Sequence, residues 1–169
     1  MSAGKLRALG LLTAPTRSRR GVETAATGDP TSPQGLLQRC DAGALVGGLS
    51  VAMDLRPDEL FGPLTHQLGG LAVKLKVLEV RGDRPVELTV TLGPSPQTWE
   101  LDDLAGLIDR LNERFAAQRS VKVAAVLGEW EDLLQLWCLP KSALAKLLEA
   151  PFFSPSNLAS LRAIAEQRG

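Results

Sequence analysis

Apolar and polar residues alternate through residues 71–92 on either side of Gly82-Asp83, which is the pattern of a β-hairpin with one buried face. A two-residue loop at Gly82-Asp83 pairs Val77 with Leu88, so that both side chains lie on the same side of the sheet. The predicted buried face comprises Val73, Leu75, Val77, Leu88, Val90 and Leu92.

A second apolar stretch occupies residues 121–127. It is β-branched and apolar on both faces apart from Lys122, which predicts a strand at the centre of the sheet. The next segment, residues 133–139, has two interpretations. The spacing of its Leu and Trp residues fits a helix, whereas the Gly128–Asp132 turn and the stop at Pro140 fit a second hairpin, which we favour.

Helical spacing is clearest in residues 102–115, with Asp102 as the predicted N-cap. A second helix is predicted to begin at Pro57 and to be kinked or split by Gly62-Pro63. The shorter predicted elements are a helical turn at 36–40, a strand at 50–55, a helix at 141–150 and a last helix that Ser154 caps and Pro155 begins.

These elements predict an α+β fold, because two units of hairpin followed by helix succeed one another along the chain. We expect a ββαββα core in which the two hairpins form one antiparallel sheet, with helices on one face and flanking N- and C-terminal helices. Residues 35–169 are expected to form this single domain. Residues 1–34 are expected to be a basic, mostly disordered arm, since their composition offers little apolar surface to bury.

Charge is unevenly distributed, although 19 basic and 19 acidic residues balance over the 169-residue chain. Residues 1–34 carry a net charge of +3 and the remainder −3, so the body lacks the concentrated basic face that nucleic-acid binding requires. The arm has three interpretations: an inert tail, an organellar transit peptide, or a docking peptide whose leucines form a short helix in a partner's groove. We therefore expect a cytoplasmic protein, or a mitochondrial or other organellar one if the arm is a transit peptide.

Reactive residue types form no recognised catalytic or metal-binding pattern. Ser50 follows Gly-Leu as in a nucleophile elbow, but Ala52 replaces the final glycine and the one histidine, His66, lies only sixteen residues further on. Cys40 and Cys138 match neither metal-ligand spacing nor a disulfide framework. No apolar run approaches the roughly 20 residues that span a bilayer. The sequence thus predicts no catalytic, cofactor or metal site and no membrane span.

Aromatic residues beside Gly or Pro breaks are the remaining candidates, because such rings either cover a core or anchor an interface. Together with the basic cluster of the arm, they form the predicted partner-binding set: Trp130, Phe152, Phe153, Arg17, Arg19 and Arg20. The leading hypothesis is a non-catalytic protein-interaction or regulatory adaptor module that forms a homo-oligomer through a sheet edge or the aromatic-bearing end. The alternatives are a chaperone or assembly factor that binds an extended client segment, and a small hydrolase.

Overall fold

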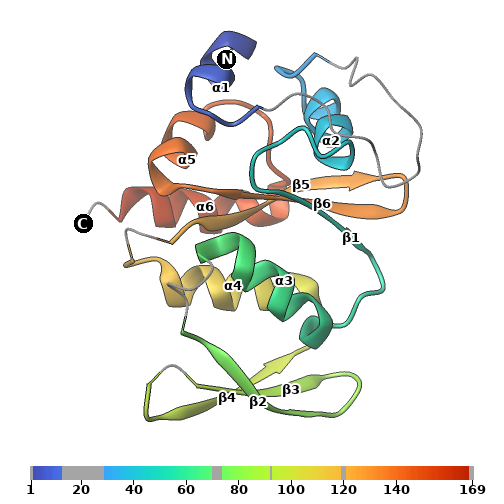
Figure 1. The fold of residues 1–169 in the computed structure, drawn as a ribbon, viewed down its shortest axis with the longest axis vertical. Helices are drawn as coiled ribbons and strands as arrows, with labels where there is room; N and C mark the ends of the chain where they lie inside the picture. Colours follow the sequence, from blue (N-terminus) through green and yellow to red (C-terminus); the bar gives the residue numbers. More distant parts are fainter. Residues whose placement is uncertain (1, 13–28, 70–73, 92, 119–120, 168–169) are drawn as a thin grey trace. The chain divides into compact units, whose positions relative to one another are not determined.

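The computed structural model describes residues 2–12, 29–69, 74–91, 93–118 and 121–167. Their contacts divide the chain into two compact units: unit 1 consists of Met1–Met53 with Val123–Gly169, and unit 2 consists of Asp54–Lys122. Unit 2 is therefore continuous in sequence and is inserted between two segments of unit 1. Each unit has its own three-stranded antiparallel sheet, its own helices and its own core (Figure 1).

The sheet of unit 1 has the strand order β1-β6-β5, in which both neighbouring pairs are antiparallel. Its strands are β1 (Gly48–Ala52), β5 (Val123–Trp130) and β6 (Leu133–Leu139). Every residue of β6 from Gln135 to Leu139 is buried, so both faces of the central strand are covered. Trp137 stands opposite Gly48 on one side and Ala125 on the other, and these small neighbours leave room for its indole.

The described residues of unit 1 form four helices: α1 (Ala3–Ala8), α2 (Pro33–Asp41), α5 (Lys141–Leu147) and α6 (Pro155–Glu166). Helix α2 packs across all three strands, while α6 packs on β5 and α5. The start of α2 is well defined because Pro33 occupies its first turn and the Ser32 side chain accepts a hydrogen bond from the Gly35 amide at 3.0 Å. Gly35 leaves no room for a side chain, since a Cβ there would meet the Asp29 carbonyl.

The first residues of the chain pack on unit 1. Leu6 of α1 and Leu11 after it are buried, and Leu12 forms an isolated antiparallel bridge with Leu45. This part of the predicted arm is therefore structured in the protein. Residues 13–28 lie outside the described residues, and their disorder stays a prediction.

The sheet of unit 2 has the strand order β2-β3-β4. Its strands are β2 (Lys76–Arg81), β3 (Val86–Thr91) and β4 (Pro96–Leu101). Leu88 of the central strand pairs with Val80 on one side and Trp99 on the other, so these three side chains share the face that carries the core. The next row, in which Glu87 pairs with Arg81 and Glu100, lies on the opposite, exposed face.

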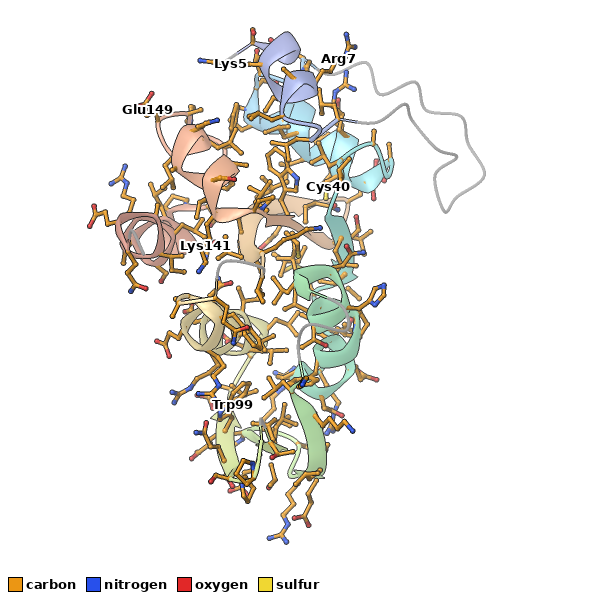
Figure 2. The ribbon with its side chains drawn as sticks, turned by 60° about the vertical axis from the view of Figure 1, so that its left-hand side comes forward. Lys5, Arg7, Cys40, Trp99, Lys141 and Glu149 are labelled. Carbon is orange, nitrogen blue, oxygen red and sulfur yellow. The ribbon has the colours of Figure 1, made fainter. Side chains whose placement is uncertain are left out.

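Two helices cover the core face of this sheet: α3 (Pro57–Gly69) and α4 (Leu104–Phe115). Helix α3 packs on β3 and on α4, and α4 packs on β4. Trp99 points from the sheet toward α3, where its ring centroid lies 6.5 Å from that of Phe61 (Figure 2). The predicted apolar stripe of the 102–115 helix is confirmed as the buried face of α4, but Asp103, not Asp102, is the N-cap and accepts from the Gly106 amide at 2.8 Å.

The α+β class is confirmed, but the prediction that both hairpins share one sheet is wrong. Each hairpin gains its own third strand instead, β1 beside β6 and β4 beside β3. The strand interpretation of residues 133–139 is confirmed. Because β1 pairs with β6, that strand takes the central position we predicted for residues 121–127, and β5 lies at an edge.

The predicted register of the first hairpin is also wrong. The loop has four residues, Gly82 to Pro85, and the Arg84-Pro85 peptide is cis. Val80 consequently faces Leu88, and an irregularity at Leu78 shifts the remaining pairs. Of the predicted buried face, Leu75, Leu88 and Val90 are buried, Val77 is half-buried, and Val73 and Leu92 lie outside the described residues.

Three smaller predictions also differ from the structure. Strand β4 was not predicted because its segment begins in a proline-rich turn, yet Pro96 is tolerated as the first residue of an edge strand. Of the two alternatives predicted at Gly62-Pro63, a kink or a split, the split does not occur, because α3 continues to Gly69. The strand predicted at 50–55 instead spans Gly48–Ala52, so Met53 lies just beyond its end and is exposed.

Candidate interaction surface

The two residues considered for hydrolase chemistry do not form a catalytic pair. Ser50 lies in β1 of unit 1, where its hydroxyl donates to Gln135 Oε1 at 2.5 Å. His66 is exposed on α3 of unit 2. Within the part of the chain that the structure describes, no three His, Cys, Asp or Glu side chains gather where they could hold a metal ion.

Cys40 is a buried thiol at the end of α2 beside β1 (Figure 2). Its Sγ donates to the Leu136 carbonyl at 3.3 Å. Burial raises the pKa of this thiol from 9.0 to about 12, because the thiolate would lose its hydration. Cys40 therefore stays protonated at neutral pH, unlike a thiol whose lowered pKa activates it as a nucleophile.

The raised pKa of Cys40 predicts a loss of stability at alkaline pH. The thiol ionises above pH 9.0 in the unfolded chain but only near 12 in the folded one, so the free energy of unfolding falls as pH rises through this interval. When pH is raised from 7 to 10, we expect the free energy of unfolding to fall by about 1.4 kcal/mol more in wild type than in Cys40→Ala. Urea unfolding at each pH measures this difference. Cys40→Ser, which keeps a donor and does not titrate here, should behave like the alanine variant. Equal pH slopes in all three proteins would contradict the assignment.

The buried amide of Gln135 is the second polar feature of unit 1. The side chain is fully buried on the central strand, and its oxygen accepts from Ser50. Its Nε2 has no hydrogen-bond partner among the described residues. Because this amide has no exposed surface, it offers no ligand a route from solvent, and we regard the Ser50–Gln135 pair as part of the core.

The aromatic candidates separate into two groups. Phe152 and Phe153 are only 2% and 7% exposed, so both rings pack inside unit 1, and their role in partner binding stays a prediction. Trp130 ends β5 and is half-buried, and its role in partner binding stays a prediction. The basic cluster Arg17, Arg19 and Arg20 lies outside the described residues. Its docking and targeting roles therefore stay predictions.

Hydrogen bonding at the β5 edge explains why Phe152 and Phe153 are buried. The Val126 carbonyl accepts from the Ser154 amide at 2.8 Å, and the Val126 amide donates to Asn157 Oδ1 at 2.9 Å. Ser154, just before α6, and Asn157, in the first turn of α6, therefore satisfy both backbone groups of Val126 at the β5 edge. A covered edge of this kind is closed to a further strand.

The remaining edges differ in their apolar content. Strand β4 begins with Pro96 and exposes mainly polar side chains along its length. Strand β1 has its exposed apolar neighbours, Val46 and Met53, beyond its two ends. In β2, by contrast, Leu78 is 60% and Val80 is 40% exposed within the strand itself. We call the open side of β2, from Lys76 to Arg81, the β2 edge.

The position of Val80 explains why the β2 edge exposes apolar surface. Val80 and Val77 pair with Leu88 and Val90, which are fully buried, so they extend the core face of the sheet to its margin. Helices α3 and α4 pack on β3 and β4, and the apolar face therefore ends partly uncovered at β2. Exposed apolar side chains on an edge strand favour the addition of another strand.

Arg56 anchors the hairpin that carries this edge. Its guanidinium donates to Asp58 in the first turn of α3 at 2.9 Å and to Asp83 in the β2–β3 loop at 2.6 Å. It also donates to the Gly82 carbonyl in the same loop at 3.3 Å. The hydrogen bonds to Asp58 and Asp83 raise the pKa of Arg56. The backbone amide of Arg56 also donates to Glu59, which completes the cap of α3. The end of the β2–β3 hairpin is thus connected to the first turn of α3.

Sequence reasoning did not identify Leu78, Val80 or Arg56 as parts of a surface. The alternation in 71–92 assigned Val77 to a buried face but could not reveal how far the helices cover it. The pair Glu79 and Arg81 was also visible only as charge on a strand. In the structure their side chains form an exposed ion pair, Glu79 Oε1 to Arg81 Nε at 2.8 Å.

Among the described residues, no helix combines the length and the apolar character needed to cross a membrane. Comparison of the chain with models of protein families, with curated proteins and with solved structures finds no match in any of the three.

Proposed function

We propose that this chain is a non-catalytic protein-interaction module, regulatory or adaptor in role, which associates with a second copy of itself through the β2 edge. The observation that carries the proposal is the exposure of Leu78 and Val80 on an edge strand that continues a buried apolar face. A partner strand would remove this apolar surface from water and pair the backbone groups on the open side of β2.

A second copy is favoured because the β2 edge presents apolar residues between charges of both signs, Lys76, Glu79 and Arg81. Such an edge complements itself when two copies meet antiparallel about a two-fold axis. One strand edge is a small interface, so we expect a reversible dimer with a Kd of roughly 1–100 μM.

Self-association can be tested by placing a charge at Val80, where the apolar core face ends on the β2 edge. In Val80→Lys we expect dimerisation to be lost, because a lysine at this margin would be desolvated in the interface. The monomer should stay folded, because Val80 is already 40% exposed and lysine can keep its charge in water. Size-exclusion chromatography with light scattering, at concentrations above the expected Kd, measures the result.

The matched control is Gln97→Lys. Gln97 pairs with Val90, so it occupies the same face as Val77 and Val80 but at the opposite edge, where it is exposed. This variant should dimerise like wild type. A wild-type chain that is monomeric throughout the concentration range would refute the proposal, and so would a Val80→Lys variant that dimerises normally.

An extended segment of another protein could pair with the same edge, as in the chaperone or assembly-factor alternative. Nothing in the described residues favours that occupant over a second copy. A monomeric wild-type chain that retains one stoichiometric client, lost in Val80→Lys, would replace self-association with client binding. The geometry at Ser50 disfavours the hydrolase alternative, because its hydroxyl donates to a buried amide rather than to a base.

A further inference from the structure

The charges of the β2 edge lie in a fixed order on one face. Glu79 pairs with Thr89 and Arg81 pairs with Glu87, which puts both side chains on the exposed face of the sheet. Val80, between them, lies on the core face opposite Leu88. The edge therefore alternates an acid, an apolar residue and a base.

This order makes the edge complementary to itself in one particular register. When two copies pair antiparallel with Val80 opposite Val80, Glu79 of each copy stands opposite Arg81 of the other. Both charge pairs then share the exposed face, and the two valines share the core face. The two sheets would continue into one another with their core faces on the same side.

Other registers are less favourable. Pairing centred on Glu79 sets two carboxylates against each other, and pairing that uses the full length of β2 sets Lys76 against Arg81. Pairing of Lys76 with Glu79 matches those two charges, but it sets Lys74 against Arg81. It also sets Val80 against Leu75, which precedes β2 and is already buried. Complementary charge and exposed apolar surface coincide only in the Val80 register.

We propose that two copies of this chain pair through their β2 edges in the register centred on Val80, with reciprocal Glu79–Arg81 contacts. This inference rests on the proposed function, because it specifies the partner strand and its register. The exposed ion pair within each copy would become part of a four-charge cluster at the two-fold axis.

The test uses two charge variants of the full chain, Glu79→Lys and Arg81→Glu. In a homodimer of either variant, both cross-strand contacts become like-charged, and we expect the dimer Kd to rise about tenfold or more. In a mixture, the lysine introduced in the first variant would face the glutamate introduced in the second, while the unchanged Arg81 of the first faces the unchanged Glu79 of the second. The two variants should therefore form a heterodimer with an affinity near that of the wild-type homodimer.

Native mass spectrometry of the separate and mixed variants distinguishes these species by mass. Glu100→Lys is the matched control, because Glu100 lies on the same exposed face of the sheet but on β4. This control should dimerise like wild type. Circular dichroism of each variant verifies that the monomer is folded, and cross-pairing in the mixture shows the effect to be between chains rather than within one strand.

The possible outcomes separate the two proposals. A dimer that Val80→Lys abolishes, but whose affinity is unchanged in both charge variants, would overturn the register and leave the proposed function standing. An Arg81→Glu homodimer at least as tight as wild type, beside a weakened Glu79→Lys homodimer, would assign the Lys76–Glu79 register instead. A monomeric wild-type chain would overturn both proposals. Selective heterodimer formation supports the Val80 register.

Discussion

Replacing Trp137 with alanine is expected to lower the free energy of unfolding of unit 1 by about 4 kcal/mol. Trp137 is 0% exposed at the centre of β6, and its cross-strand neighbours Gly48 and Ala125 cannot expand to fill the space that the indole leaves. The substitution also removes the hydrogen bond that Nε1 donates to the Val46 carbonyl at 3.1 Å. Urea unfolding followed by far-UV circular dichroism measures the loss.

Trp137→Phe separates the contribution of the buried ring from that of the hydrogen bond to Val46. It keeps an aromatic ring in the site but lacks the donor to Val46, so we expect a loss of about 2 kcal/mol. The order of stability should therefore be wild type, then phenylalanine, then alanine. An alanine variant that unfolds at the wild-type urea concentration would show that Trp137 is not part of a closed core.

Replacing Gly47 with alanine is expected to destabilise unit 1 by about 3–5 kcal/mol, although the change adds a single methyl group. Gly47 has a φ of +82°, and a Cβ at this position would come within contact distance of the Cys138 carbonyl, in the backbone of β6. That backbone cannot retreat easily, because the Cys138 amide donates to the Gly47 carbonyl at 2.8 Å. Both strain and steric overlap therefore oppose the methyl group.

Two other glycines provide controls that separate strain from overlap. Gly93 has the same φ of +82° in unit 2, and Gly10 has a φ of +67° in unit 1, yet a Cβ at either position would meet nothing within 4 Å. Alanine at each should cost about 1 kcal/mol from backbone strain alone. Thermal unfolding of the three variants compares them. Equal losses at Gly47 and Gly10 would show that β6 moves aside at little cost.

The two units differ in how their edge strands β5 and β2 are covered, and this difference supports the proposed function. Unit 1 covers its β5 edge with the backbone of Ser154 and the side chain of Asn157, whereas unit 2 has exposed Leu78 and Val80 on β2. An uncovered apolar edge is a risk for aggregation unless a partner strand occupies it. The contrast within one chain is the physical reason to regard β2 as a binding surface.

Local pattern determined much of this protein from sequence alone. The helix at 104–115 and the strands of both hairpins were inferred from periodicity, turn residues and residue type. These properties depend on neighbours a few residues apart in the chain. For that reason they can be predicted without knowing what packs against them.

Tertiary structure alone decided the partition into two sheets, the central position of β6 and the exposure of β2. Strand β1 meets β6 across 85 residues, as at Ser50 and Gln135, and no local pattern encodes that choice. Alternation marked Val77 and Val80 as apolar without showing that Val77 is half-buried and Val80 is 40% exposed in the folded chain. Exposure depends on which elements cover a face, and that is settled only when distant segments pack together.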